Sequence, residues 1–275
     1  MSKMTKALVA FIFLATQAVV VAPSNALPNL TTKQSSSVKS LFAAFATSDP
    51  DKIAAASVKF TKAGSAARNF AEMVKNNHAT IKYFKSINVF GMPSGLAVSA
   101  ETNGKSTVKG TVVTLNSVNN AFDGRYSEFT FDAAGKISNF KVATSAGKSS
   151  QKVSDRIFAI KQSQTSGAML VTGGYVYKQP DAKLFVQLQV KNSSSSLKSW
   201  SYANGRYASA ENKYYAAPIS PVGCLYPGQT AFMQSTVSDT PVVVAGTGAA
   251  FEAPTFEGCG DGSASAGMAL RFTTG

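Results

Sequence analysis

Residues 184–191 read Leu-Phe-Val-Gln-Leu-Gln-Val-Lys, so that apolar side chains alternate with mostly polar ones. Successive side chains of a β-strand point to opposite faces, and this period of two predicts a strand with one face in a hydrophobic core. Further strands, separated by turn residues, are predicted at 169–177, 230–237, 242–244 and 268–273. Gly173 and Gly174 predict a bulge or bend in the first of these. The second half of the chain is therefore predicted to be all β.

Two segments of this half carry a family resemblance. Residues 190–194 (Val-Lys-Asn-Ser-Ser) end a strand in Asn-Ser, and residues 225–232 (Leu-Tyr-Pro-Gly-Gln-Thr-Ala-Phe) enter a later strand through Pro-Gly. Both segments resemble those of bacterial extracellular immunoglobulin-like domains. The resemblance implies an immunoglobulin-like β-sandwich over residues 167–275.

The N-terminus has the pattern of a signal peptide. Lys3 and Lys6 precede a mostly apolar run at 7–22, and Ser24-Asn25-Ala26 offers a small-residue cleavage site before Leu27. The run is shorter than the roughly 20 residues of a membrane-spanning helix, which favours cleavage over a retained anchor. We expect residues 1–26 to be removed. The mature protein is expected to be secreted, periplasmic or associated with the cell envelope, and to have no transmembrane segment.

The chain contains two cysteines, Cys224 and Cys259. An exported protein can keep one intramolecular disulfide oxidised, and closing a loop of about 35 residues stabilises the fold by roughly 3–4 kcal/mol. The alternative is a thiol nucleophile or a metal pair, but the only histidine, His78, lies in the other half. The spacing differs from that of the usual immunoglobulin core disulfide. We therefore expect a Cys224–Cys259 disulfide between late loops, and neither a metal nor a cofactor.

The positive charge is concentrated in the first half. The formal net charge is +13, and residues 27–150 hold 15 Lys and Arg against 7 Asp and Glu, whereas residues 151–275 hold 10 against 7. Such a surface attracts anionic envelope polymers and lipid head groups. The alternative is an ordinary solvated helix surface. The candidate contact residues are Lys52, Lys59, Lys62, Arg68 and Lys75.

The cations are mostly lysine, with 22 Lys and 5 Arg. Arginine supplies the planar fork that recognises bases and phosphates, whereas lysine is a point charge. No basic-aromatic RNA-binding motif occurs. The composition therefore argues against specific nucleic-acid recognition.

Three helices are expected near the start of the mature chain. Ser35-Ser36-Ser37 offers N-caps for the first, whose apolar residues recur at helical spacing up to Phe45. Asp49-Pro50 predicts the start of a second helix, with Asp as N-cap and Pro at the first position. Ser65 opens a third helix, predicted to end near Ala79.

A curved antiparallel meander is predicted after these helices. Its strands are expected at 81–86, 96–98, 107–115, 126–131 and 137–142, and residues 131–137 (Phe-Asp-Ala-Ala-Gly-Lys-Ile) form a hairpin. This order of elements and this hairpin resemble the NTF2-like, SnoaL-type superfamily over residues 33–145. The resemblance implies an α+β cone that can hold a small apolar ligand, and some members are isomerases or lyases.

The predicted organisation is an NTF2-like α+β domain at 27–145, a linker at 146–166 and an immunoglobulin-like domain at 167–275. The linker prediction follows from the small, polar residues at 144–152. Residues 199–217 are predicted to be a long exposed loop, because they contain several Ser and five aromatic side chains. Its candidate contact residues are Trp200, Tyr202, Tyr207, Tyr214 and Tyr215, the alternative being ordinary core packing.

His78 is the one candidate catalytic residue. It can serve as a general base inside a cone, or it can be a half-packed histidine at a helix C-terminus. No other catalytic constellation is present in the sequence. We therefore expect an exported, non-enzymatic binding protein that associates with the anionic cell envelope or with another extracellular protein. The alternative is a cone-pocket enzyme of the isomerase or lyase type, or a small-ligand carrier, that uses His78.

Overall fold

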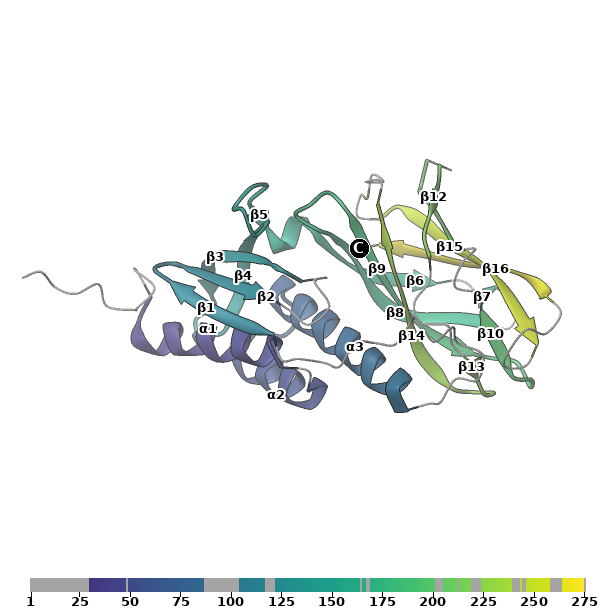
Figure 1. Cartoon of the computed structure of the whole chain (residues 1–275), viewed down its shortest axis with the longest axis horizontal. Coiled ribbons are helices and arrows are strands. Elements are labelled where there is room, and N and C mark those ends of the chain that lie inside the picture. Colours follow the sequence, from purple (N-terminus) through teal and green to yellow (C-terminus); the bar gives the residue numbers. More distant parts are fainter. Residues whose placement is uncertain are drawn as a thin grey trace, which may run out of the picture.

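The computed structural model describes residues 30–274 with gaps at 48, 87–103, 117–121, 164, 167–168, 201–204, 212, 219–223, 239–242, 244–245 and 258–263 (Figure 1). The predicted signal peptide, the predicted strand at 96–98, Tyr202 and Cys259 lie outside the described residues.

Three helices begin the described chain: α1 (Thr32–Phe45), α2 (Pro50–Phe60) and α3 (Ala66–Ser86). The prediction for α2 is confirmed, since Asp49 is its N-cap and Pro50 its first residue. The predicted start of α1 at the serines is wrong. Thr31 is its N-cap and forms a capping box with Gln34, in which each side chain accepts a hydrogen bond from the other residue's backbone N–H.

Helix α3 runs seven residues beyond the predicted end at Ala79, through the stretch 81–86 that was predicted to be a strand. The apparent period of two there is short, and a helix that is already formed gains one hydrogen bond for each residue it adds. The strand prediction for 81–86 is therefore wrong.

The first sheet is an antiparallel meander in the order β1-β2-β3-β4-β5. Its strands are β1 (Lys105–Lys109), β2 (Val112–Asn116), β3 (Gly124–Phe131), β4 (Ile137–Ala143) and β5 (Gln151–Lys152). The hairpin between β3 and β4 is confirmed, whereas the single strand predicted at 107–115 is wrong. Gly110 adopts a φ of +60° and reverses the chain between Lys109 and Val112, which pair with each other.

The second sheet has eleven strands, in which β12-β11-β15-β16-β6-β8-β9-β14 form one path. The strands on this path are β6 (Ile157–Ser163), β8 (Met169–Lys178), β9 (Leu184–Asn192), β11 (Arg206–Ala208), β12 (Tyr214–Ala216), β14 (Thr230–Val237), β15 (Gly248–Glu257) and β16 (Ala264–Thr274). Three short strands lie off this path. Strand β7 (Thr165–Ser166) pairs with β8, and strand β10 (Lys198–Trp200) pairs with both β15 and β13 (Cys224–Leu225).

Strand β6 joins the two parts of this sheet, one on the β8 side and one on the β16 side. Residues 157–159 pair with β8, and residues 160–163 pair with β16. The sheet curls at this point, so that Leu188 of β9 and Met233 of β14 share one core cluster with Phe251 of β15 and Leu270 of β16. The second half is therefore a single continuous sheet curled around its own core.

The predicted fold class, an NTF2-like α+β domain followed by an immunoglobulin-like sandwich, is wrong. The described chain is mostly β, with three N-terminal helices, a five-stranded meander and a large curled antiparallel sheet. Within the predicted linker, the described residues from 151 onward form regular structure, since β5 completes the first sheet and a 3-10 turn (Val153–Asp155) leads into β6 of the second.

Helix α3 lies between the two sheets (Figure 1). Its buried residues join the core cluster of the first sheet, which also contains Tyr177 of β8 and Phe185 of β9. Strand β9 is therefore buried on both faces over its first half, where the alternation alone predicted one exposed face. Gln187, on the face predicted to be polar, is fully buried and donates a hydrogen bond to the carbonyl oxygen of Met73 in α3.

Candidate binding surfaces

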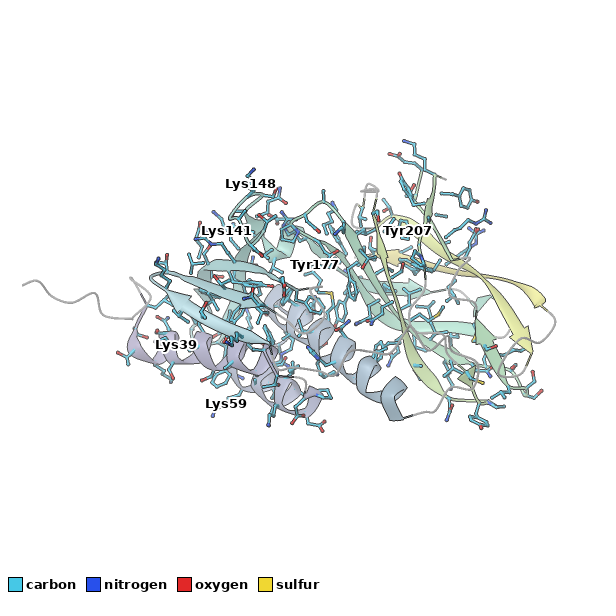
Figure 2. All side chains as sticks on the ribbon, in the orientation of Figure 1. Lys39, Lys59, Lys141, Lys148, Tyr177 and Tyr207 are labelled. Carbon is cyan, nitrogen blue, oxygen red and sulfur yellow. The ribbon has the colours of Figure 1, made fainter. Side chains whose placement is uncertain are left out.

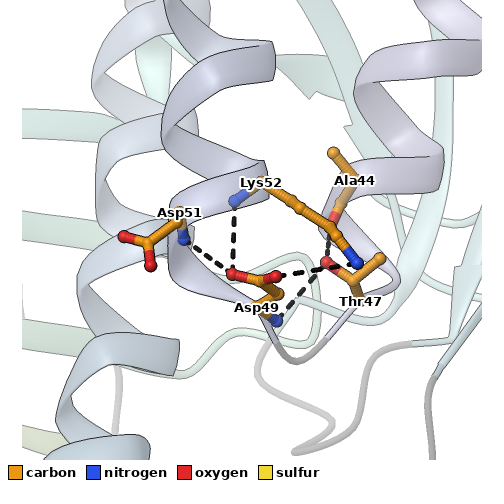
Figure 3. Close-up of polar contacts among 5 residues, drawn as sticks. All are labelled: Ala44, Thr47, Asp49, Asp51 and Lys52. Carbon is orange, nitrogen blue, oxygen red and sulfur yellow. Dashed lines mark hydrogen bonds and ion pairs between the residues drawn. The ribbon is translucent and has the colours of Figure 1, made fainter.

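The carboxylates of the first half make contacts within the protein. Asp49 accepts hydrogen bonds from the backbone N–H groups of Asp51 and Lys52, at 3.0 and 3.3 Å (Figure 3). Its second oxygen lies 3.6 Å from the Lys52 ammonium. This carboxylate therefore stabilises the N-terminus of α2, where the helix dipole favours a negative charge.

Three other carboxylates of this half also have partners within the protein, each of a different kind. Glu72 accepts a 2.6 Å hydrogen bond from the Tyr175 hydroxyl, across the boundary between α3 and the second sheet. Burial, followed by this hydrogen bond, raises the pKa of Tyr175 well above its ordinary value. Glu128 lies 2.7 Å from the Lys141 ammonium, and Asp132 accepts a bond from the backbone of Lys136. These acids are therefore held by the fold itself.

The predicted helix lysines remain at the surface. Lys52, Lys59 and Lys62 are exposed, and Lys75 is half-buried. Within the part of the chain that the structure describes, no carboxylate lies within ion-pair distance of Lys59 or Lys62. Lys52 and Lys59 are two turns apart on α2 and share one side of it. Figure 2 shows Lys39 and Lys59 on the helical side of the first half.

The Arg68 side chain is engaged in hydrogen bonds within the protein, at the C-terminal end of α2. Its guanidinium donates to the Thr61 hydroxyl at 2.6 Å, to the Thr61 carbonyl at 2.9 Å and to the Val58 carbonyl at 3.3 Å. The Lys136 ammonium also donates to the Val58 carbonyl, at 3.2 Å. Two cations thus satisfy the last carbonyls of α2, where the helix dipole favours positive charge.

We expect Arg68→Ala to lower the free energy of unfolding by about 1–3 kcal/mol, because charged hydrogen bonds to the hydroxyl and carbonyl of the buried Thr61 are lost. Lys62→Ala, at an exposed neighbouring site, is the control and should change it by less than about 0.5 kcal/mol. Urea denaturation followed by circular dichroism measures both values. Equal midpoints for the two variants would contradict a capping role for Arg68.

The five-stranded sheet presents a second basic surface, which the sequence analysis did not identify. Its helix-facing side is covered by α1 and α3, and the opposite side, here called the outer sheet face, carries no helix or second sheet among the described residues (Figure 1). Lys105, Lys109, Arg125, Lys141 and Lys152 belong to this face, since the register places them with the outward positions of neighbouring strands. Glu128 is the one carboxylate in the sequences of β1 to β5.

The aromatic residues predicted at 199–217 do not form one surface in the described residues. Tyr207 is 1% exposed and packs against Phe251 in the second core, with ring centroids 6.2 Å apart. Tyr214 is 57% exposed and lies under the guanidinium of Arg206, while Tyr215 is half-buried. Trp200 belongs to β10, which pairs with β13 and β15. Strands β10, β11 and β12 thus replace much of the predicted exposed loop.

His78 is fully buried in α3, at the boundary with the second sheet. The adjacent Asn77 donates a 3.0 Å hydrogen bond from its amide to the Gln234 side chain of β14. A general base must reach a substrate, and His78 has no exposed surface in this arrangement. Its position is that of a packed residue between the helix and the sheet.

Cys224 lies at the start of β13. No free cysteine is present in the described residues. The predicted partner, Cys259, lies outside them, so the Cys224–Cys259 pairing stays a prediction.

Comparisons with known protein families, with curated proteins and with solved structures found no match for this chain. Among the helices that the structure describes, none has both the length and the apolar character needed to cross a membrane.

Proposed function

We propose that this protein is an exported, non-enzymatic binding protein that associates with anionic material of the cell envelope through the basic surface of its first half. One observation carries this proposal. The carboxylates Asp49, Glu72, Glu128 and Asp132 are engaged within the protein, whereas most lysines of the same half are exposed. The first half therefore presents an excess of positive charge to solvent, and such a surface attracts polyanions.

The burial of His78 and the structural position of Arg68 agree with a binding role carried by exposed lysines. A lysine ammonium binds phosphate or carboxylate groups as a point charge, without a fixed geometry. Recognition of this kind depends on charge density and is weakened by salt.

The test is cosedimentation of the purified protein with phosphatidylglycerol-containing vesicles and with isolated envelope material. We expect binding at about 0.05 M salt and its loss by about 0.5 M, because the Debye length shortens from more than 10 Å to less than 5 Å over that range. Phosphatidylcholine vesicles are the control. Binding that is independent of salt, or equal for the two kinds of vesicle, would refute the proposal.

A further inference from the structure

We infer that the outer sheet face is a docking surface for a linear polyanion, an extended polymer with repeated phosphate groups. The inference rests on the proposed function and assigns it to one face of one sheet. Five cations belong to this face, and the one carboxylate on its strands is already paired with Lys141. The face therefore keeps a clear positive excess after its internal ion pair is formed.

The register brings like charges together on this face. Lys141 of β4 and Lys152 of β5 are directly opposite each other. Like charges at directly opposite positions destabilise a pair of strands. Glu128 offsets part of this repulsion through Lys141, but Lys152 is exposed and has no ion pair in the described part of the structure. An anion bound across β4 and β5 would relieve the remaining repulsion.

A second cationic position lies beside the hairpin that joins β4 and β5. Arg125 of β3 is opposite Ala143 of β4, and its guanidinium lies beside Gly147, where a Cβ atom would meet Nη1 at 2.8 Å. Lys148 is exposed in the same hairpin, on the side that Figure 2 shows together with Lys141. Planar guanidinium groups bind phosphate oxygens through two parallel hydrogen bonds. Arg125 is therefore the residue of this face with a geometric preference for phosphate.

The shape of the face favours a polymer over a bilayer. Neighbouring strands are about 4.8 Å apart, so the five strands span roughly 19 Å, and an extended chain can contact cations on several strands at once. The hydroxyls of Thr107, Thr114 and Ser127 lie between the cations and can donate hydrogen bonds. The large exposed apolar side chains of the described chain lie elsewhere, at Val58, Tyr214 and Tyr226. Apolar side chains that enter the interface strengthen binding to a bilayer, and a face without them relies on charge alone.

The experiment compares two variants that each lose four positive charges. The sheet variant carries K105Q, K109Q, R125Q and K152Q, and it keeps Lys141 because Glu128 pairs with it. The helix variant carries K33Q, K39Q, K59Q and K62Q on the opposite side of the first half, and it keeps Lys52 because Asp49 pairs with it. All eight positions are exposed, so both variants should keep the wild-type circular dichroism spectrum and unfolding midpoint. The probes are long-chain inorganic polyphosphate and phosphatidylglycerol vesicles, titrated at several salt concentrations.

We expect the sheet variant to lose polyphosphate affinity on the order of 100-fold at about 0.1 M salt, with a salt slope lower by about 3, because each phosphate contact releases counterions. The helix variant should lose less than about threefold. Equal losses would overturn the inference and leave the proposed function standing. Wild-type protein that binds vesicles but not polyphosphate, or a sheet variant that loses only vesicle binding, would also overturn the inference alone. If the wild-type protein bound neither polyphosphate nor the vesicles, both the inference and the proposed function would be refuted.

Discussion

Gly174→Ala is expected to unfold the protein, or to lower its free energy of unfolding by more than about 3 kcal/mol. Gly174 has a φ of +133°, which side-chain-bearing residues rarely adopt. A Cβ atom at this position would lie 2.0 Å from the carbonyl oxygen of Gln187 and 3.0 Å from the Cα atom of Leu188. Both atoms belong to the backbone of β9, so that neither can move unless the strand moves.

The neighbouring glycine provides a matched control. A Cβ atom at Gly173 would meet only the side-chain oxygen of Gln189, at 3.6 Å, which is an ordinary contact with a flexible group. We expect Gly173→Ala to change the free energy of unfolding by less than about 1 kcal/mol, since it also restricts the unfolded chain. Thermal and urea denaturation of the two variants measure the difference. Similar midpoints would show that β8 and β9 can separate at this point without loss of the fold.

This pair of glycines also shows which features the sequence could predict. A bulge was predicted at Gly173-Gly174, and the register shift lies immediately before these residues, between Val171 and Gly173. The Asp49-Pro50 helix start and the hairpin at 131–137 are confirmed. Each of these features is determined by residues within a few positions of one another, through a cap, a ring constraint or a positive φ.

Features that depend on distant contacts were not predictable in this way. Phe185 and Gln187 are on the face of β9 that the alternation predicted to be exposed. They are buried because this strand packs against distant parts of the chain, Phe185 against Phe122 and Gln187 against Met73. Alternation shows which residues of a strand share a face, but it does not show which distant element packs on that face. The two-domain prediction had no signal for a helix shared by two sheets.

Strand β15 illustrates a local signal that is misleading. No strand was predicted at 248–257, and its sequence contains Pro254, a residue that cannot donate to a ladder. Residues 250–252 of β15 pair with β11, and residues 255–257 pair with β10. Pro254 lies between these two partners, and on the other side of the strand it is opposite Gly267 of β16. The tertiary arrangement thus tolerates a residue that argues against a strand.

The sequence predicted the positive charge of the candidate site, but it did not predict which surface carries that charge. The composition correctly indicated a basic first half, and of the candidate lysines Lys52, Lys59 and Lys62 are exposed while Lys75 is half-buried. The outer sheet face was missed because 107–115 was treated as one strand, which hid the turn at Gly110. The alternation Lys105-x-Thr107-x-Lys109 is the signal that identifies this face once the turn is placed.

Phe70→Ala is expected to destabilise both halves of the protein together. Phe70 of α3 is fully buried. Its ring centroid lies 5.4 Å from that of Phe140 in the first sheet and 5.4 Å from that of Tyr177 in the second. Truncation of a buried phenylalanine removes about 3–5 kcal/mol from the free energy of unfolding. Because the lost contacts belong to both sheets, the loss should not be confined to one half.

Two signals report on the two halves separately. The helical circular dichroism signal follows α1 to α3, and Trp200, the only tryptophan, provides a fluorescence signal from the second half. We expect both signals to give one common urea midpoint in the wild-type protein and a common, lower midpoint in Phe70→Leu, which retains part of the packing. Val58→Ala is the control, since Val58 is 62% exposed and should change stability by less than about 0.5 kcal/mol. If the Trp200 midpoint stayed at its wild-type value while the helical signal shifted, the second sheet would be stable without α3, and the shared core could not be what joins the two halves.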